Sequence, residues 1–405
     1  MRTAAADFVA WDTEGRSLAF SRTGSSLTQR VAGPITKNKH STRLVLQRAG
    51  IPVPKGRSFR FSDLLWAEEY AESLGYPVVV KPLNGMEGKG VVTDVMSKAQ
   101  LEWAFSHVEE SAYGGGDILV EEQIRGEAYR FLVIRDRVVS VLYKRRGRIV
   151  GDGSKSVGAL IEEKQAFRRA NPHLLSRPLK VTEATNQLLS QQGYGLESVP
   201  AEGEEVLITY SSNTHQGGEH AQVISQVHSS YLEASVEAVK AIPGLKFAGV
   251  DFLIEDPTQP IETQGAAICE VNSVPGADTH EYPLIGEPRP VISELLLHSA
   301  SESGVRLRNS PATDVDVDVE IVGRFKDQTY VEWLNEKAKS LGVTGEVARI
   351  TSTRASGAWF GSPHMVSILV SFAHLGLRGS PVKSVGVAHR GGTSTSVTTT
   401  EAAEL

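Results

Sequence analysis

The chain has 405 residues, which is too long for one small domain and predicts two or three domains. Hydrophobic residues make up 40% of it and charged residues 22%, as in an ordinary soluble globular protein. The net charge of -6 excludes a general nucleic-acid binder, because no chain-wide basic excess is present to neutralise phosphates. The local basic cluster at 144–146 is therefore interpreted as site chemistry or as a solvated face.

The chain contains a single cysteine, Cys269, which excludes an intramolecular disulfide and fits a reducing compartment. It lies in the apolar run 266–269, so we expect a buried, unreactive thiol. Residues 1–10 lack the apolar segment of a signal peptide, and no run of 18 apolar residues is present. We therefore expect a cytoplasmic protein without a membrane partner.

Secondary structure is expected from the N-terminus onward. A strand pair at 7–11 and 17–20 precedes a helix at 37–49, and a second helix at 68–74 ends at Gly75. β-Branched and apolar runs predict strands at 77–81, 118–122, 130–142 (two strands around a hairpin turn at 135–137), 206–210, 249–254 and 267–271. Further helices are expected at 181–192, 229–241 and 289–303.

The pattern changes near residue 305. Residues 309–313 predict a linker, and the alternating segment 315–322 after it predicts an edge strand. Helices at 330–341 and 365–375 and a strand near 382–387 follow, before a tail rich in Ser and Thr that is expected to be disordered. No repeat of solenoid period is present, and the mixture of strands and helices predicts the α+β class throughout.

The first segment that can carry chemistry is the loop after the strand that ends at Lys81. It contains three glycines and a second lysine, which are Gly85, Gly88, Gly90 and Lys89. Glycines let backbone N–H groups approach phosphate oxygens, and lysines neutralise the phosphate charge. The segment fits neither the P-loop nor the Rossmann pattern, so a plain β-hairpin turn remains the alternative.

A second set of polar residues lies on two neighbouring apolar strands. Asp251 is on one strand, and Glu270 and Asn272 are two residues apart on the next, so they share one face. Three oxygen ligands at adjacent strand ends suit Mg²⁺, which takes carboxylates together with nucleotide phosphates. Solvated acids on an edge strand are the alternative interpretation.

Three further segments are ambiguous by themselves. Residues 121–124 leave a strand with backbone groups that could hydrogen-bond an adenine edge. The sequence Gly-Asp-Gly at 151–153 predicts a tight turn after the basic residues 144–146. Residues 213–218 contain His215, for which a polar surface position is the alternative to a catalytic base.

Together these segments resemble the ATP-grasp carboxylate–amine ligases, in particular the ATP-grasp modules of bifunctional glutathione synthetases and of cyanophycin synthetase. The resemblance covers residues 7–305 and rests on motifs in the family's order with family-like gaps. They are Asn38-Lys39, then 49–56, 80–83 with the glycine loop, 126–131, 150–153, 198–200, 213–218, 249–251 and 269–276. The resemblance implies an ATP-grasp fold for residues 1–305, with a shortened N-terminal part and a nucleotide-binding lid near 76–145.

The resemblance also implies which residues hold the nucleotide. Lys39 and Lys81 look like the two lysines that grip its phosphates. The loop that closes over the phosphates corresponds to Gly85, Gly88, Lys89 and Gly90. Glu121 looks like the residue at the adenine pocket, with the backbones of Glu122 and Ile124 at the adenine edge.

The other matching positions concern the metal and the substrates. Asp251, Glu270 and Asn272 look like the magnesium ligands. Lys144 lies where the family often has an arginine near the transferred phosphate, and Arg289 is a candidate clamp for the substrate carboxylate.

The chain departs from the family pattern at two positions. The family commonly has an acid that contacts ribose where this chain has Ala128, which leaves the neighbouring Glu127 as the candidate. It also has an arginine that assists the phosphate where this chain has Thr209. Nearby groups such as Lys144, Arg146 or His215 substitute for it, or activity is reduced. The catalytic candidates are therefore Lys144, Arg146, Arg289 and Asn213.

The implied activity is ATP-dependent formation of an amide or peptide bond through an acyl-phosphate. The implied cofactors are ATP and Mg²⁺, with Mn²⁺ as a substitute, and the implied substrates are a small carboxylate and an amine such as an amino acid or short peptide. We expect positioning and exclusion of water to carry the rate. A homodimer or higher oligomer is expected, without nucleic acid.

Residues 315–388 resemble the acylphosphatase fold, a small ferredoxin-like α/β sandwich, through segments 323–325, 333–338 and 341–347. That family uses an arginine and an asparagine where this chain has Val331 and Arg349, and its phosphate loop is altered at 326–329. The resemblance therefore implies a non-catalytic module, followed by a disordered tail at 389–405.

Two other functions stay open. A non-catalytic nucleotide-binding regulatory protein is supported by Ala128 and Thr209. An acylphosphatase fused to a binding domain is disfavoured, because the arginine and asparagine of that family are missing.

Overall fold

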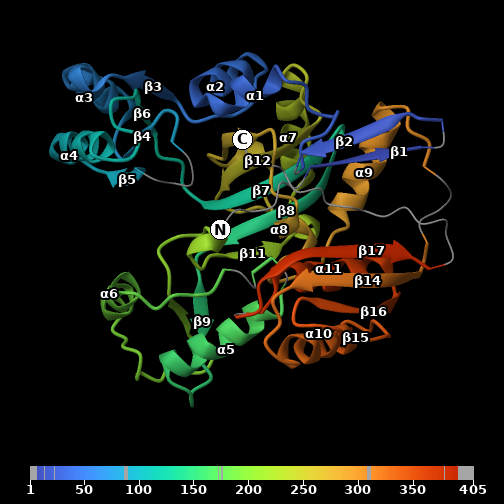
Figure 1. Cartoon of the computed structure of the whole chain (residues 1–405). Coiled ribbons are helices and arrows are strands. Elements are labelled where there is room, and N and C mark those ends of the chain that lie inside the picture. Colours follow the sequence, from blue (N-terminus) through green and yellow to red (C-terminus); the bar gives the residue numbers. More distant parts are fainter. Residues whose placement is uncertain are drawn as a thin grey trace. The chain divides into compact units, whose positions relative to one another are not determined.

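The computed structural model describes residues 7–12, 14–21, 23–85, 90–171, 173–174, 177–307, 312–377 and 379–390. They divide into two compact units (Figure 1): Met1–Gln165 with Leu179–Leu307, and Ala166–Pro178 with Arg308–Leu405. No sequence pattern predicted that Ala166–Pro178 groups with the C-terminal part, and the domain limits stay a prediction. The expected linker at 309–313 and the tail at 389–405 lie largely outside the described residues. Within the described ranges, no helix combines the length and apolarity needed to cross a membrane.

An antiparallel sheet with the strand order β11-β8-β7-β12-β13 forms the centre of the first unit. Its strands are β7 (Glu127–Ile134), β8 (Arg137–Arg145), β11 (Glu219–Gln222), β12 (Phe247–Ile254) and β13 (Ala267–Asn272). Helix α7 (Ser229–Ala241) covers one face, where Tyr231 and Phe131 pack against Phe252. Leu132 and Phe247 point to the other face and pack with helix α9 (Val291–Glu302). Burial on both faces explains why β12 and the second half of β7 are nearly continuous apolar runs.

A second sheet of the first unit has the order β3-β6-β4-β5. Its strands are β3 (Gly56–Phe59), β4 (Val78–Pro82), β5 (Val92–Val95) and β6 (Ile118–Glu122). Helices α3 (Leu64–Leu74) and α4 (Lys98–Glu109) pack on it through Ala71 and Phe105. The strands predicted at 77–81 and 118–122 are confirmed, whereas α4 was not predicted.

The N-terminal segment is a strand pair followed by two helices. Strands β1 (Asp7–Trp11) and β2 (Ser17–Ser21) pair as expected. The helix predicted at 37–49 is divided into α1 (Ala32–Lys37) and α2 (Lys39–Arg48). Asn38 separates them because its backbone is extended and its side chain accepts a hydrogen bond from Ser41 N at 2.9 Å, which caps α2.

Two short strands and two helices extend from the end of β8. Strands β9 (Arg148–Val150) and β10 (Glu205–Leu207) pair with each other, and helices α5 (Val157–Arg169) and α6 (Glu183–Gln191) accompany them. The strand predicted at 206–210 is therefore too long. After Leu207 the N–H groups of Ile208 and Thr209 both turn to the carbonyl of Gly147, so no ladder continues.

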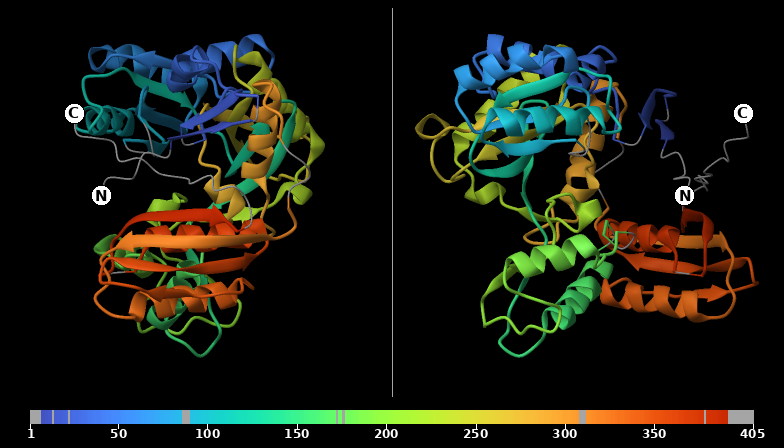
Figure 2. Two further views of the ribbon diagram at one scale, coloured as in Figure 1. Left: turned by 45° about the vertical axis from the view of Figure 1, so that its right-hand side comes forward. Right: turned by 90° about the vertical axis from the view of Figure 1, so that its left-hand side faces the viewer.

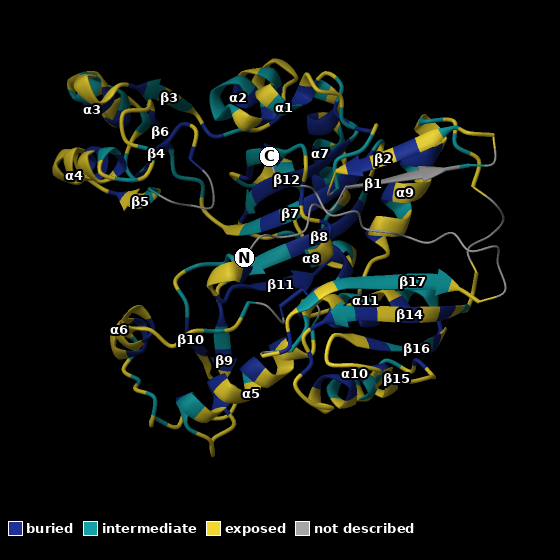
Figure 3. Cartoon of the chain, viewed as in Figure 1, coloured by how far each residue is buried: buried dark blue, intermediate teal, exposed yellow. Residues whose placement is uncertain are grey.

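The C-terminal part of the second unit has the element order β14 (Val315–Gly323), α10 (Thr329–Ser340), β15 (Val347–Arg349), β16 (Arg354–Gly361), α11 (Pro363–Leu375) and β17 (Val382–His389). The strands lie side by side in the order β15-β16-β14-β17 (Figure 2). Strand β14 is thus central, and the predicted edge position is wrong. Its residues alternate between buried and exposed because only one face of the sheet is covered (Figure 3). The resemblance to acylphosphatases stays a prediction.

Candidate active site

A pocket in the first unit gathers four of the predicted nucleotide and metal residues. Its walls come from helix α2, from strands β4 and β6 of one sheet and from strand β13 of the other. The four residues are Lys39, Lys81, Glu121 and Glu270. Segments far apart in the sequence therefore meet where the resemblance implies a bound nucleotide.

Lys81 and Glu121 form a buried ion pair across the neighbouring strands β4 and β6. Nζ of Lys81 donates to Oε1 of Glu121, and the two side chains are only 11% and 9% exposed. Each charge of a buried ion pair offsets part of the desolvation cost of the other, so the loss of either partner is destabilising. An anionic ligand that recruits Lys81 must therefore compete with Glu121.

Lys39 joins helix α2 to the start of the glycine loop. Its Nζ donates to the carbonyl of Gly85 at 2.6 Å. Burial lowers the pKa of Lys39, and the nearby carboxylate of Glu270 opposes that shift. Gly90 has a positive φ of 72°, as the predicted turn requires. The loop residues Gly88 and Lys89 lie outside the described residues.

The segment expected at the adenine edge is partly used by the protein itself. The N–H of Glu122 donates to the carbonyl of Lys55 at 2.9 Å, and Oε1 of Glu122 accepts from Lys55 N at 2.8 Å. The backbone N–H of Glu122 already donates a hydrogen bond within the protein, so it is not free to donate to an adenine. The roles of Glu122 and Ile124 at an adenine edge stay predictions.

Asp251 lies at the centre of a charged cluster on β12. Its carboxylate accepts two hydrogen bonds from Arg130, at 2.6 Å from Nε and 2.7 Å from Nη2, and lies 3.5 Å from Nζ of Lys144. Burial alone would raise the pKa of Asp251, but the charges of Arg130 and Lys144 outweigh it and hold the pKa well below its usual range. Arg130, directly opposite Asp251 on β7, was not identified from the sequence.

The three predicted metal ligands lie on adjacent strands. Asp251 pairs with Glu270, and Gly249 pairs with Asn272, across β12 and β13. Nδ2 of Asn272 is buried without a hydrogen-bond partner among the described residues. As a donor this nitrogen cannot bind a cation, so Oδ1 of Asn272 would be the metal ligand. No cluster of three His, Cys, Asp or Glu side chains able to hold a metal occurs within the described ranges. Two carboxylates and an amide nevertheless fit Mg²⁺ whose other ligands are phosphate oxygens.

Cys269 lies in the same region, at an irregularity of strand β13. The register of β12 with β13 shifts there, because Asp251 pairs with Glu270 but Phe252 pairs with Ile268. Its Sγ donates to the carbonyl of Asp251 at 3.3 Å. The residue is half-buried, not fully buried as expected. Desolvation of the thiol, followed by the charge of Asp251, raises its pKa to about 12, which agrees with an unreactive cysteine.

Part of the chain is similar to known proteins. Residues 38–143 match the family described as carbamoyl-phosphate synthase L chain, ATP binding domain. Cyanophycin synthetase of Trichormus variabilis is 32% identical over 263 residues, which are 64% of this chain and 28% of that protein. The glutathione biosynthesis bifunctional protein of Desulfotalea psychrophila is 27% identical over 293 residues, which are 72% of this chain and 37% of that protein. The crystal structure of a bifunctional glutathione synthetase from Pasteurella multocida superimposes with a TM-score of 0.56 at 25% identity, covering 71% of this chain and 39% of that one.

The chain contains an ATP-grasp domain. ATP binding follows from this assignment for the part of the chain that holds Lys39, Lys81 and Glu121. The chain spans well under half the length of the curated relatives that it matches, 28% and 37% in the two cases above.

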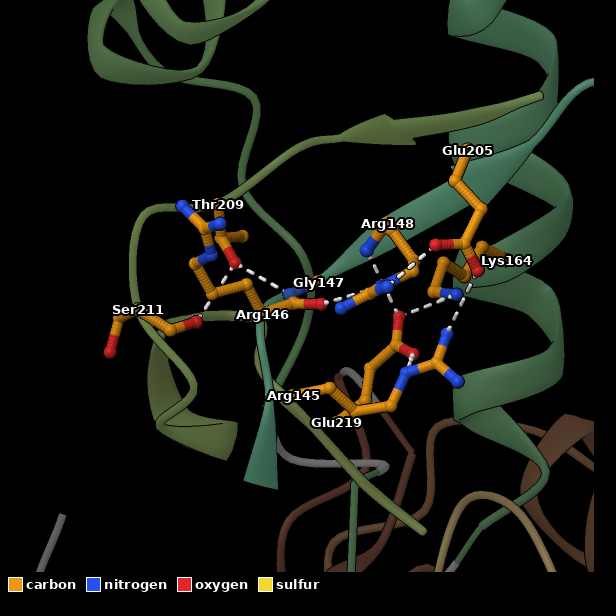
Figure 4. Close-up of polar contacts among 9 residues, drawn as sticks. All are labelled: Arg145, Arg146, Gly147, Arg148, Lys164, Glu205, Thr209, Ser211 and Glu219. Atoms are coloured by element: carbon orange, nitrogen blue, oxygen red, sulfur yellow. Dashed lines mark hydrogen bonds and ion pairs between the residues drawn. The ribbon is translucent and has the colours of Figure 1, made fainter. Parts of the chain in front are cut away.

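The end of β8 in the ATP-grasp domain carries a dense ionic cluster around Glu219 (Figure 4). The carboxylate of Glu219 is fully buried and lies 2.6 Å from Nζ of Lys164 and 3.4 Å from Nε of Arg145. Arg148 pairs with Glu205 at 2.6 Å. These contacts fix the backbone that presents Lys144 and Arg146 on either side of Arg145.

Thr209 is the residue at which the resemblance implies a departure from the family pattern, with an arginine expected there. Its Oγ1 accepts a hydrogen bond from Gly147 N at 2.8 Å and donates to the carbonyl of Ser211 at 3.0 Å. Gly147 cannot carry a Cβ, because that atom would lie 2.4 Å from the carbonyl oxygen of Gly217. In Figure 4 the exposed side chain of Arg146 extends toward the side of Thr209 and away from Glu219. The turn between β8 and β9, which contains Gly147, thus lies against the loop that begins at Asn213.

The remaining predicted residues lie outside the described lining of the pocket. Oδ1 of Asn213 accepts from His215 N at 2.9 Å and caps a short turn, so its side chain already has a structural role. Nε of Arg289 donates to the carbonyl of Val139 at 3.3 Å, and the residue is exposed. Glu127 is exposed at the start of β7. Their predicted roles stay predictions.

Proposed function

We propose that the chain is an ATP-dependent carboxylate–amine ligase that forms an amide or peptide bond between small amino-acid-like substrates through an acyl-phosphate. The observation that carries the proposal is the pocket in which Lys39, Lys81 and Glu121 meet Glu270. Two lysines beside Glu270, a candidate metal ligand, suit the polyphosphate of ATP. The charged cluster around Asp251 suits the γ-phosphate, which is the group that is transferred. The ATP-grasp assignment supports the same function.

In the proposed first step, a substrate carboxylate oxygen attacks the γ-phosphorus of ATP. A bond forms between that oxygen and phosphorus, and the bond from phosphorus to the bridging β–γ oxygen breaks, which releases ADP. In this proposal Lys39 and Lys81 neutralise the phosphates, and Lys144, next to Asp251, faces the transferred group. Mg²⁺ held by Asp251, Glu270 and Asn272 would supply further positive charge at the phosphate oxygens.

In the second step, the amine nitrogen attacks the acyl carbon and expels inorganic phosphate, and the nitrogen loses a proton. The protein supplies little covalent chemistry in either step. Its contribution is to position the groups and exclude water. We propose that the glycine loop, with Gly85, Gly88, Lys89 and Gly90, covers the phosphates, and that Arg146 and Arg289 contact the anionic substrates.

The relatives' names suggest amino acids or short peptides as substrates, and we propose this class for the chain. We also propose that the second unit is a non-catalytic module and that the protein forms a homodimer or higher oligomer. The alternative function is a nucleotide-binding regulator, for which Thr209 and Ala128 are the supporting residues.

The test is a phosphate-release screen with ATP, Mg²⁺ and a matrix of amino acids and dipeptides, with products identified by mass spectrometry. We expect at least one pair of substrates to give stoichiometric ADP, phosphate and a product lighter by one water than the sum of the two. ATP binding without turnover for every pair would favour the regulator instead. The variant Lys81→Met, which removes a phosphate contact, serves as the negative control.

A further inference from the structure

Arg43 is a buried cation in the nucleotide pocket to which neither the sequence nor the proposed mechanism assigns a role. It lies one helical turn after Lys39 on α2, is only 6% exposed and lines the same pocket. Two cations four residues apart on one helix face repel each other, and burial raises that cost. Such a pair therefore calls for anionic partners inside the pocket.

Gly56 leaves room for the guanidinium of Arg43 near Glu121. Gly56, on β3, pairs directly with Glu121 on β6. A Cβ added to Gly56 would lie 2.5 Å from Nη1 of Arg43 and 2.7 Å from Cβ of Glu121, so both atoms lie within 2.7 Å of one point. Burial lowers the pKa of Arg43, and the charge of Glu121 is the first interaction that opposes this shift. Glu121 thus has a second cation beside it, in addition to Lys81.

A phosphate that binds in the pocket changes which charges around Glu121 are paired. In the structure, Lys81 is paired with Glu121. If Lys81 turns to a phosphate, Glu121 becomes a buried carboxylate without that partner, and breaking a buried pair is costly. Nη2 of Arg43 lies 3.0 Å from Nδ1 of His40. A guanidinium has five N–H donors, and the side chain of Arg43 forms no other hydrogen bond with the described residues.

We propose that Arg43 is a positioning residue that takes over the charge of Glu121 when nucleotide phosphate draws Lys81 away. Nucleotide binding then exchanges one buried ion pair for another. This inference rests on the proposed function, since it requires a phosphorylated nucleotide in this pocket.

The test is the affinity for ADP, measured by isothermal titration calorimetry in the absence of other substrates, in a double-mutant cycle. Arg43→Met is made in the wild-type chain and in the Glu121→Gln variant. The neutral amide of that variant cannot form an ion pair with Lys81. We expect Arg43→Met to weaken ADP binding about tenfold in the wild type and less than about twofold in Glu121→Gln. Equal weakening in both backgrounds overturns the proposal, because it shows direct contact or general disruption.

Two control variants distinguish the charge of Arg43 from its packing. Arg43→Lys keeps the charge, so we expect it to restore ADP affinity to within about threefold of the wild type. A loss as large as that of Arg43→Met assigns Arg43 a packing role and overturns the inference. Arg48→Met removes an exposed arginine from the same helix and should leave affinity unchanged. If the wild-type protein binds no ADP, the proposed function itself is refuted. That outcome differs from one in which the wild type binds ADP and only the variants fail to follow the expected pattern of affinities.

Discussion

Arg130 and Asp251 face each other across strands β7 and β12, and the guanidinium donates two parallel hydrogen bonds to the carboxylate, at 2.6 and 2.7 Å. This bidentate pair lies inside the first unit, with the Arg130 and Asp251 side chains only 21% and 7% exposed. Asp251 is therefore both a predicted metal ligand and a structural anion. The two roles predict different effects from substitutions at Asp251 and at Glu270.

We expect Asp251→Asn and Glu270→Gln both to abolish ATP turnover, because each removes a carboxylate of the proposed metal site. Only Asp251→Asn should also lower the free energy of unfolding, by about 3 kcal/mol, because it leaves Arg130 buried without its partner. Urea denaturation together with the phosphate-release assay checks both effects. Full turnover in Glu270→Gln would contradict the metal assignment, and unchanged stability in Asp251→Asn would contradict the structural role.

The depressed pKa of Asp251 also predicts how stability depends on pH. A carboxyl whose pKa is lower in the folded than in the unfolded state stabilises the fold fully above its unfolded value of about 3.9 and loses that effect as pH falls toward the folded value. The stability difference between wild type and Asp251→Asn should therefore be constant above about pH 5 and shrink below about pH 4. Urea midpoints at several pH values measure it. A difference that grows toward low pH would show that Asp251 does not titrate in this way.

Some of the residues that the structure gathers in the pocket could be singled out from the sequence because they lie in short local patterns. Lys81 ends a β-branched strand before three glycines, and Glu270 and Asn272 are two apart on an apolar strand. Local patterns of this kind fix the face on which a side chain lies. Arg130 and Arg43 were missed because their importance depends on the strand or helix opposite them. For Arg43 one local sign was available, namely its spacing of four from Lys39.

The fold was predictable where periodicity is strong and less so where tertiary contacts decide. Strand β14 was expected at an edge because it alternates, yet it is central and has one open face. The strand expected at 206–210 stops at Leu207, because the carbonyl of Gly147, distant in sequence, takes two of its N–H groups. No single-sequence pattern contains either contact.

The buried carboxylate of Glu219 provides a test of the cluster in Figure 4. We expect Glu219→Gln to lower the free energy of unfolding by about 3 kcal/mol, because Lys164 and Arg145 lose the charge that holds them together. Glu205→Gln is the matched control. Its side chain is 50% exposed, so the loss of its pair with Arg148 should cost less than about 1 kcal/mol. Urea denaturation of both variants decides, and equal costs would show that burial does not set the strength of these pairs.

Arg146 is the proposed source of the positive charge that the resemblance implies at Thr209. Arg145 and Arg148 are held by carboxylates, whereas the side chain of Arg146 has no carboxylate within ion-pair distance among the described residues. If Arg146 serves the transferred phosphate, Arg146→Ala should lower kcat about a hundredfold, as the loss of one transition-state contact does. Unfolding free energy should stay within about 0.5 kcal/mol, because the side chain is exposed.

The double variant Arg146→Ala with Thr209→Arg tests whether the position of the charge matters. An arginine at 209 would place the cation where the resemblance implies one, with loss of the hydrogen bond from Gly147 N to Thr209 Oγ1. We expect part of the lost kcat to return, although the hydrogen-bond loss should lower stability by about 1 kcal/mol. Steady-state kinetics on any substrate pair found in the screen measures the effect. If Arg146→Ala leaves kcat unchanged, the phosphate is served by another group, and Lys144, 3.5 Å from Asp251, is then the cation to substitute next.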